Sequence, residues 1–332
     1  MSVLNDQHGR TFSYLRLSLT DACNFRCQYC LPRGYQRSVE SSNGEENTPL
    51  SLAEIENLVA GFSDLGVTKV RLTGGEPTLR RDIVEIVSCV SRVPGISTVA
   101  LTTNGYRLKT LLTPLIEAGL SAVNISVDSL DARRFAEVTG SRCFGRVLDG
   151  LESVLASGIK RVKINVVLLK SSYREELASY MKLLRESPVT VRFIELMETG
   201  DNRDYFNQEY LAGVSLREIL EEDGWVATTR SATDGPAIEY RHTAYRGRVG
   251  LISPYSPDFC AGCNRLRVSS RGELKLCLFG EGVISLRDYL QCPEQRPLLV
   301  ARVRELVRQK PAAHRLHEGI FGSTAHLASI GG

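Results

Sequence analysis

Residues 14–30, YLRLSLTDACNFRCQYC, form a strand-like run followed at once by three cysteines. Cys23, Cys27 and Cys30 have C-x3-C-x2-C spacing, so a compact loop can turn three thiolates toward one point. Soft thiolates in such a loop select iron–sulfur clusters or zinc. A [4Fe–4S] cluster on three cysteines keeps one iron open for a small molecule. The alternative is a structural zinc site with a distant fourth ligand, although zinc ligands usually come as two pairs.

Composition is that of a folded globular protein, with 42% hydrophobic and 24% charged residues among 332. The net charge is only +3 and the basic residues form no block, which argues against a nucleic-acid partner. No apolar run approaches the ~20 residues of a membrane span, and residues 1–10 lack the apolar core of a secretory signal. We therefore expect a cytoplasmic protein with no membrane partner, whose clustered cysteines are metal ligands rather than disulfides.

Strand-like and helix-like segments alternate from residue 14 to about residue 197. Six such units predict a parallel sheet covered by helices, either open and doubly wound or curled into a partial barrel. The predicted strands are Tyr14–Thr20, Lys69–Gly74, Thr98–Asn104, Ala122–Asp128, Val162–Leu169 and Thr190–Leu196. The predicted helices are Ser51–Leu65, Asp82–Val93, Arg107–Ala118, Phe144–Ala156 and Tyr173–Glu186.

Polar residues alternate with apolar ones along these strands, whereas buried parallel strands normally read as continuous apolar runs. In the first strand Leu15 and Leu17 fall on one face and Arg16 on the other. Helices must cover the apolar face, so the polar face lines something else. We therefore expect a six-stranded (β/α)6 partial TIM-type barrel with a wide cationic interior that binds a large polyanion. The plainer reading is that polar residues are scattered at strand ends.

Two loops carry further signals. Residues 73–77, TGGEP, follow the second strand, and two adjacent glycines let the backbone approach a ligand closely. Residues 33–49 form a long polar stretch without periodicity, which we interpret as a mobile loop over the barrel mouth.

The pattern changes after residue 200, so we predict a barrel domain at 1–200 and a small C-terminal α+β region at 201–332. Residues 201–206 read as a charged linker, and Val214–Gly224 as a short helix. Two further short strands are expected at Ile238–His242 and Arg248–Ser253.

A second cysteine triplet lies in this region. Cys260 and Cys263 precede a predicted hairpin, residues 266–278, which returns Cys277 to their side. The triplet can hold a second [4Fe–4S] cluster with an open iron, or a zinc ion in a zinc ribbon with His242 or Cys292 as the fourth ligand.

The segment Asn264-Arg265-Leu266-Arg267, with two arginines, follows Cys263 immediately. Strand alternation puts Arg265 and Arg267 on the same side, and guanidinium groups suit bidentate recognition of phosphate. A solvated surface pair is the plainer reading.

The first triplet resembles the signature of the radical S-adenosylmethionine (radical SAM) superfamily, and TGGEP resembles its segment that binds the SAM amino group. Both triplets, TGGEP, CNRLR at 263–267 and the terminal Gly331-Gly332 together resemble one family, the GTP 3′,8-cyclases of molybdenum cofactor biosynthesis. The resemblance extends from Arg16 to Gly332.

This resemblance implies two [4Fe–4S] clusters, each on three cysteines, together with SAM. The cluster on Cys23, Cys27 and Cys30 would be catalytic, and a 5′-deoxyadenosyl radical would remove hydrogen from C3′ of GTP. Attack on C8 would then give (8S)-3′,8-cyclo-7,8-dihydroguanosine 5′-triphosphate. The second cluster, on Cys260, Cys263 and Cys277, would bind the guanine base.

The resemblance also implies contact residues and partners. Positions that match SAM contacts are Tyr29, Gly75, Ser126 and Met197. Positions that match GTP contacts are Arg16, Arg71, Thr102, Lys163, Arg265, Leu266 and Arg267. Gly331 and Gly332 are expected near Arg16. Partners would be an electron donor and the cyclic pyranopterin monophosphate synthase that acts next, and the family is often dimeric.

Two other functions compete with this one. A radical SAM enzyme with an auxiliary cluster can modify peptides, but such enzymes usually carry additional C-terminal cysteines. An iron–sulfur electron carrier or a zinc-stabilised binding module is the alternative from another class. Neither an electron carrier nor a binding module needs a cationic interior.

Overall fold

The computed structural model describes residues 3–36, 48–229 and 234–331, and within them one sheet of twelve strands. Strands β1 to β6 lie side by side in chain order and all pair in parallel. This confirms the predicted α/β fold with a mostly parallel sheet. Their bounds are β1 Tyr14–Ser18, β2 Lys69–Thr73, β3 Thr98–Thr103, β4 Ala122–Ser126, β5 Val162–Leu168 and β6 Thr190–Glu195.

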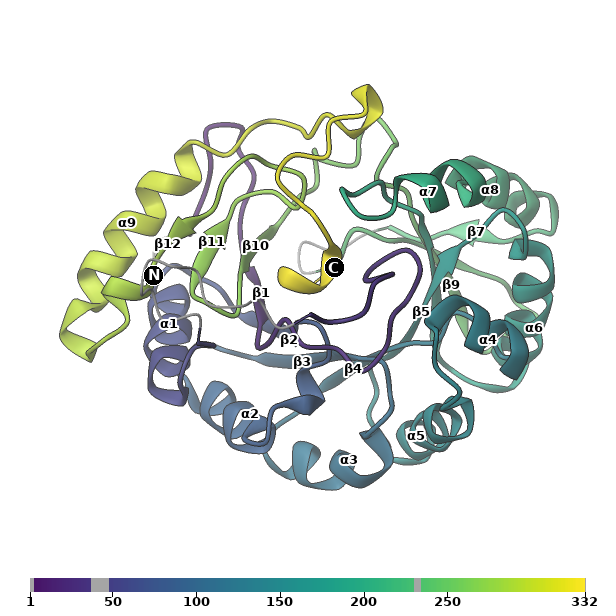
Figure 1. Cartoon of the computed structure of the whole chain (residues 1–332), viewed down its shortest axis with the longest axis horizontal. Helices are drawn as coiled ribbons and strands as arrows, with labels where there is room; N and C mark the ends of the chain where they lie inside the picture. Colours follow the sequence, from purple (N-terminus) through teal and green to yellow (C-terminus); the bar gives the residue numbers. More distant parts are fainter. Residues whose placement is uncertain (1–2, 37–47, 230–233, 332) are drawn as a thin grey trace.

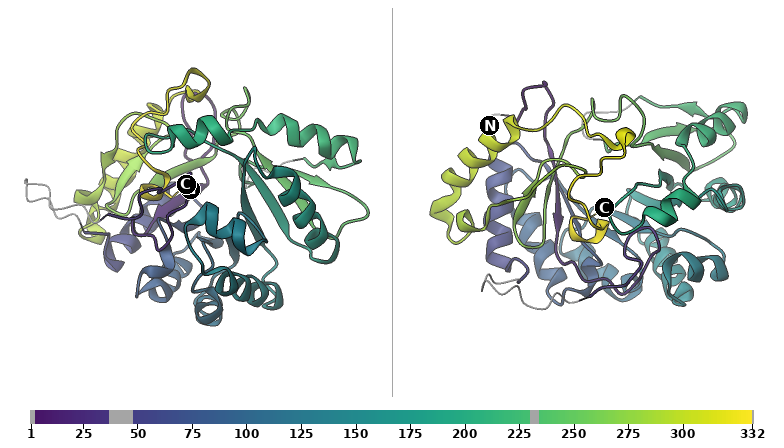
Figure 2. Two further views of the ribbon diagram at one scale, coloured as in Figure 1. Left: turned by 45° about the vertical axis from the view of Figure 1, so that its right-hand side comes forward. Right: turned by 45° about the horizontal axis from the view of Figure 1, so that its top comes forward.

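Helices cover the outside of this sheet, which curves into an arc (Figures 1 and 2). Val70 and Leu72 of β2 are fully buried beneath them, as the alternating pattern predicts. The first helix begins at a capping box in which Ser51 and Glu54 satisfy each other's backbone N–H groups. The helices are α1 Leu52–Asp64, α2 Ile83–Arg92, α3 Leu108–Glu117, α4 Ala132–Thr139, α5 Phe144–Ala156, α6 Tyr173–Glu186, α7 Arg203–Glu209, α8 Gly213–Glu222 and α9 Arg296–Arg308.

Strands from beyond residue 200 extend the same sheet at both ends, so the parallel run is longer than the six strands expected. Strand β10 (Arg265–Val268) pairs in parallel with β1, and β9 (Arg248–Ile252) pairs in parallel with β6. Antiparallel strands complete the two ends: β11 Glu273–Lys275, β12 Ile284–Ser285, β8 Ile238–Arg241 and β7 Val226–Ala227. The predicted hairpin is therefore present as β10 and β11, whereas the division at residue 200 remains a prediction.

One expectation about this region is wrong. Residues 201–206, read as a linker, lead into helix α7, because Asn202 anchors the segment in the interior. The Asn202 amide donates to the carbonyls of Tyr29 (2.8 Å) and Met197 (2.9 Å) and accepts from the N–H of Thr199 (2.9 Å). The charge of the segment was misleading, and the contact with Tyr29 that anchors it to the cysteine loop comes from a residue distant in the sequence.

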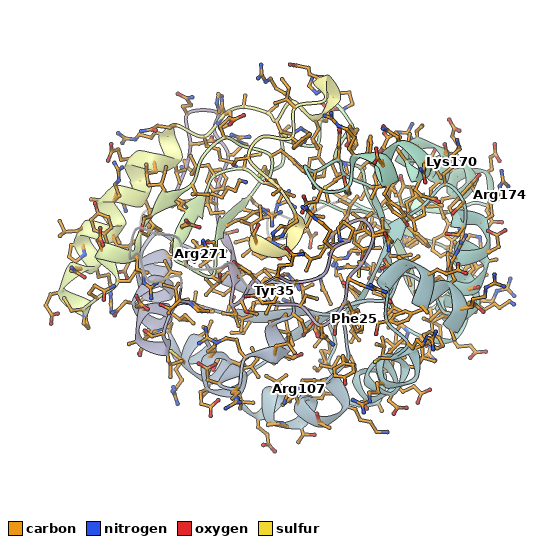
Figure 3. All side chains as sticks on the ribbon, viewed as in Figure 1. Phe25, Tyr35, Arg107, Lys170, Arg174 and Arg271 are labelled. Carbon is orange, nitrogen blue, oxygen red and sulfur yellow. The ribbon has the colours of Figure 1, made fainter. Side chains whose placement is uncertain are left out.

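Inside the arc lie the loop that follows β1 and the C-terminal segment, drawn in purple and yellow in Figure 1. Both therefore lie on the polar side of the sheet. Lys170 and Arg174, by contrast, are exposed at the outer rim (Figure 3). Most of the stretch at 33–49 that we predict to be a mobile loop lies outside the described residues. Among the described residues, no helix has the length and apolar character to cross a membrane.

Candidate active site

The cysteine loop, Cys23–Cys30, is held by the end of α4 and by an aromatic cluster. The backbone N–H groups of Arg26 and Gln28 donate to the carbonyls of the last two residues of α4, each at 3.0 Å. Phe25 is buried and packs edge-on against Tyr106 and Phe135. These contacts fix the loop at the carboxyl ends of the strands, where it faces the interior.

The three thiols of this loop line one cavity, here called the thiol cavity. Burial raises all three thiol pKa values: that of Cys23 to about 11, that of Cys30 to about 12, and that of Cys27 well above its usual value, with Asp128 adding to the last shift. Buried thiols of this kind become thiolates when a cationic group binds them. The donor set therefore fits an iron–sulfur cluster.

The residues matched to SAM contacts meet at this cavity. Tyr29, Gly75, Ser126 and Met197 all line it, together with Thr102. The structure thus brings together side chains from the cysteine loop and from the ends of β2, β3, β4 and β6.

The TGGEP segment packs against the chain just before the cysteine loop. The N–H of Gly75 donates to the carbonyl of Thr20 (2.7 Å) and the N–H of Glu76 to that of Ala22 (2.8 Å). A Cβ on Gly75 would lie 2.3 Å from the Ala22 carbonyl oxygen, and Gly74 has φ +146°. Glycine is therefore required here because two backbone segments lie close together. In the sequence analysis, the two glycines were instead explained by the close approach of a ligand.

Two buried carboxylates at the thiol cavity were missed. Glu76 accepts hydrogen bonds from Thr103 Oγ1 and the Asn104 N–H, both at 2.7 Å, and so ties β3 to TGGEP. Asp128 accepts from Tyr29 Oη at 2.8 Å, and its burial raises its pKa to about 6. A single acidic residue after a strand is too common to be singled out without this geometry.

A second cavity, here called the cation cavity, adjoins the first and shares with it Asn165, Ile194 and Met197. Five of the residues matched to GTP contacts line it: Arg16, Arg71, Lys163, Arg265 and Arg267. Lys310 lines it too, as do two cations of the strands, Lys69 and Arg192. Their place on the polar strand faces is the signal that could have added them to the predicted site.

The other two residues matched to GTP contacts, Thr102 and Leu266, are not among those that line the cation cavity. Thr102 lines the thiol cavity, but its Oγ1 accepts a hydrogen bond at 3.2 Å from Arg71, one of the cations of the cation cavity. Leu266 is fully buried in the apolar core. Its side chain points away from Arg265 and Arg267, so only its backbone can face the cavity.

The cations of this cavity crowd one another in a buried space. Burial, together with the repulsion from Arg71, lowers the pKa of Arg16 to about 10 and that of Arg192 to about 9. Burial likewise lowers the pKa of Lys69 to about 8. A ligand with several negative charges would relieve this repulsion.

The second cysteine triplet forms one wall of the cation cavity. Cys260, Cys263 and Cys277 all line it. Burial raises the pKa of Cys263, but Lys310 and Arg265 outweigh it and lower the value to about 7. This thiol is thus easily converted to a thiolate ligand.

Neither fourth ligand considered for a zinc ribbon lines this cavity. The His242 ring packs on Trp225 and Tyr245, with ring centroids 5.5 and 5.3 Å away, and Cys292 precedes the final helix. The histidine that lines the cavity is His314. Within the described ranges, no three His, Cys, Asp or Glu side chains are grouped closely enough to hold a single metal ion. In a [4Fe–4S] cluster each cysteine binds a different iron, so its ligands stand further apart than those of one ion.

The C-terminal segment reaches both cavities. The Gly331 carbonyl accepts hydrogen bonds from Arg16 (2.8 and 3.2 Å) and from Arg267 (2.7 Å). This confirms that Gly331 lies at Arg16, while Gly332 lies outside the described residues. Gly331 has φ +63°, and a Cβ there would lie 2.1 Å from Thr73 Cγ2. Glycine is required here both for its backbone conformation and for space.

Comparisons with known proteins agree with this architecture. The Radical SAM superfamily model matches residues 17–184, and the Molybdenum Cofactor Synthesis C model matches residues 189–316. SuiB of Streptococcus suis bound to S-adenosylmethionine has the same fold, with a TM-score of 0.60 at 16% identity over 90% of this chain and 69% of SuiB.

Much closer relatives have been named by activity. A GTP 3′,8-cyclase of Shewanella denitrificans is 50% identical, covering 100% of this chain and 97% of the relative. One of Synechococcus elongatus is 51% identical over the full length of both chains, and one of Aeromonas hydrophila is 51% identical over 97% of its length. The chain therefore belongs to the radical SAM superfamily and, within it, to the GTP 3′,8-cyclase family.

Proposed function

We propose that this protein is a GTP 3′,8-cyclase, which converts GTP to (8S)-3′,8-cyclo-7,8-dihydroguanosine 5′-triphosphate in the first step of molybdenum cofactor biosynthesis. The observation that carries the proposal is the pair of adjoining cavities, one lined by three thiols and one by cations and a second cysteine triplet. Such a pair can place a radical source beside a polyanionic substrate. The names of the relatives supply the substrate and the reaction.

Cys23, Cys27 and Cys30 would hold a [4Fe–4S] cluster whose open iron binds SAM. When bound, this cluster supplies the electron that cleaves SAM to methionine and a 5′-deoxyadenosyl radical. Tyr29, Gly75, Ser126 and Met197 would then position SAM. Asp128 holds the Tyr29 hydroxyl and is placed to accept hydrogen bonds from SAM itself.

GTP would lie in the cation cavity. A triphosphate carries roughly four negative charges, and buried cations offset such a charge far better than solvated ones. The cations that line it are Arg16, Lys69, Arg71, Lys163, Arg192, Arg265, Arg267 and Lys310. Cys260, Cys263 and Cys277 would hold a second [4Fe–4S] cluster, whose open iron takes the guanine base. Met197, which lines both cavities, would then lie between SAM and the ribose of GTP, whose C3′ would lose hydrogen and attack C8.

Three further partners follow from the family. An electron donor would reduce the first cluster, the cyclic pyranopterin monophosphate synthase would consume the product, and a second copy of the chain would complete a homodimer.

Anaerobic reconstitution with iron and sulfide tests the proposal. We expect about eight irons per chain, for two clusters, and 5′-deoxyadenosine formation with SAM and dithionite that depends on GTP and yields the cyclised nucleotide. Cys260→Ser should remove about half of the iron, whereas Cys89→Ser, at a cysteine in α2 outside both triplets, should retain it.

Different outcomes would identify different errors. About four irons plus zinc would refute the second cluster. SAM cleavage that is indifferent to GTP but stimulated by a peptide would replace this substrate with the peptide-modifying alternative.

A further inference from the structure

Tyr14 lines the cation cavity but was not among the predicted site residues. It begins β1, where the strand register pairs it with Lys69 of β2 on one side and Arg265 of β10 on the other. Its side chain is 4% exposed and lines the cavity. A phenol is therefore built into a site whose other polar side chains are largely cations.

The Tyr14 hydroxyl and a second contact together hold the Arg71 guanidinium. Arg71 Nε donates to Tyr14 Oη, while its NH1 donates to the Leu101 carbonyl and to Thr102 Oγ1, both at 3.2 Å. The NH2 group of Arg71 has no protein acceptor among the described residues. Because a guanidinium is planar and rigid, contacts along two of its edges fix the direction of the third nitrogen.

The surrounding charges show how closely the hydroxyl oxygen is enclosed by cations. Burial raises the pKa of Tyr14, but Arg71, Arg16 and Lys69 outweigh it and lower the value to about 7. Lys69 Nζ also lies 4.6 Å from the centroid of the Tyr14 ring, in a cation–π contact. The other cations that act on this hydroxyl are Arg192 of β6 and Arg267 of β10. The Tyr14 oxygen and ring thus partly offset the repulsion between these cations, which lie close together before any ligand binds.

Building on the function proposed above, we propose that Tyr14 is a positioning residue of the GTP site, whose hydroxyl oxygen holds the Arg71 guanidinium so that its remaining N–H group faces the triphosphate. Removing the oxygen leaves Nε of a buried guanidinium without an acceptor. The guanidinium must then turn toward another acceptor or hold water, and its alignment with phosphate is lost.

Tyr14→Phe keeps the ring and removes the oxygen, so it tests the contacts of the hydroxyl with Arg71 and Arg16 without removing the aromatic packing. We would measure, on the reconstituted full chain, the Kd values of GTP, inorganic tripolyphosphate and SAM by calorimetry. Loss of one hydrogen bond to a charged group predicts roughly a tenfold rise in Kd for GTP and an equal rise for tripolyphosphate. The Kd of SAM, which would bind in the thiol cavity, should change less than about twofold. KM for GTP should rise with kcat nearly unchanged, because the contact is uniform through the reaction.

Tyr180→Phe is the matched control, since Tyr180 is a buried tyrosine whose hydroxyl donates to the Val127 carbonyl away from the cation cavity. It should leave all three affinities unchanged. Wild-type affinities for GTP and tripolyphosphate in Tyr14→Phe would overturn the inference, as would an equal weakening of SAM, which would indicate general loosening. Failure of the wild type itself to bind GTP would instead refute the proposed function.

Discussion

The ammonium Nζ of Lys163 lies 2.5 Å from Oε1 of Glu239, so a carboxylate from β8 reaches a cation of the proposed triphosphate site. Arg248 also approaches Glu239, at 3.4 Å. Glu239 would therefore compete with a bound polyanion for Lys163, and its carboxylate offsets part of the positive charge of the cavity.

Glu239→Gln should tighten GTP binding. Removal of one negative charge from a partly buried ion pair predicts a decrease in Kd of about three- to tenfold, largest at low ionic strength. Calorimetry at two salt concentrations measures it. Glu152→Gln on the exposed face of α5 removes the same negative charge far from the strand interior and should leave the Kd unchanged. Weaker binding by Glu239→Gln would mean that Glu239 orients Lys163 rather than competes for it.

Gly331→Ala should abolish most product formation, because a methyl group would collide with Thr73 and move the carbonyl that Arg16 and Arg267 share. We expect a loss of more than roughly tenfold in kcat/KM, equivalent to about 1.4 kcal/mol or more.

Gly319→Ala is its control. Gly319 has a similar φ of +72°, but a Cβ there would have no neighbour within 4 Å. It carries the same backbone strain without the collision, so its activity should stay within about twofold of the wild type. Equal losses in the two variants would show that strain in the tail, not the Gly331 contact, is responsible.

Arg265→Ala should weaken GTP binding without loss of iron. Arg265 lines the cation cavity and lies 5.7 Å from the Phe259 ring, but it is not a cluster ligand. Removing one charge-assisted contact predicts a rise in Kd of about tenfold or more. Iron content and the Kd of GTP are measured on the same sample. Arg174→Ala at the outer rim (Figure 3) is the charge-matched control and should change neither. Lost iron with unchanged GTP affinity would refute the assignment.

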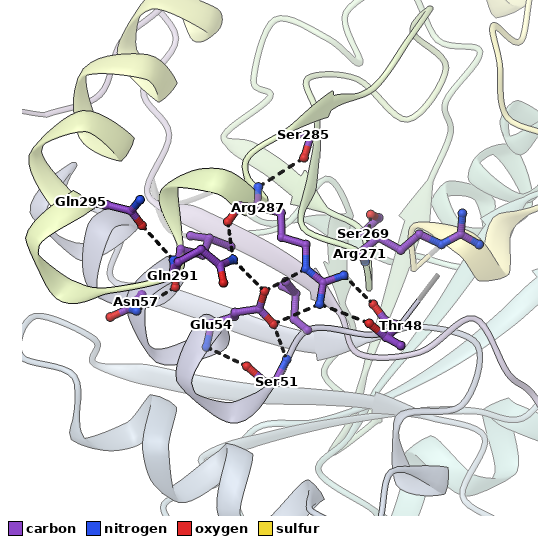
Figure 4. Close-up of polar contacts among 12 residues, drawn as sticks. Thr48, Ser51, Glu54, Asn57, Ser269, Arg271, Ser285, Arg287, Gln291 and Gln295 are labelled. Carbon is purple, nitrogen blue, oxygen red and sulfur yellow. Dashed lines mark hydrogen bonds and ion pairs between the residues drawn. The ribbon is translucent and has the colours of Figure 1, made fainter. Parts of the chain in front are cut away.

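Glu54→Gln should destabilise the fold in a pH-dependent way. Glu54 joins α1 to the segment after β12 by accepting hydrogen bonds from Arg287 at 2.8 and 3.2 Å and from Gln291 at 3.1 Å (Figure 4). Burial raises the pKa of Glu54, but these donors and Ser51 outweigh it and lower the value to about 2. The stabilisation is therefore present above about pH 4.5 and is lost as pH falls toward 2.

Chemical denaturation at several pH values tests this expectation. We expect the variant to be less stable by roughly 2 kcal/mol between pH 5 and 8, with the difference shrinking between pH 4.5 and 2. A difference that does not change across the acid range would show that the charge of Glu54 contributes little to the network.

Local patterns predicted much of the fold. All six parallel strands and the five helices between them lie where the alternation of apolar residues places them, to within two residues at each end. Helices α4 and α9 were not foreseen, and the Asp201–Phe206 segment was misread. Helices α4 and α9 bury apolar faces that only the partner elements reveal, such as the packing of α9 against α1, whereas α7 has no buried residue and follows the anchor at Asn202.

The sequence by itself determined the two cysteine triplets, the parallel order of the first six strands and the alternation that sends cations to one face. Those features are local, because they depend on spacing and on the two-residue period of a strand. Only the tertiary structure decided that β10 lies against β1, which brings Arg265 and Arg267 beside Arg16 and the second triplet beside the first cavity. It also placed Tyr14 and Glu239 at the cations. Contacts between residues hundreds of positions apart leave no trace in local spacing, since they arise when the sheet curves and its last strands pair with its first.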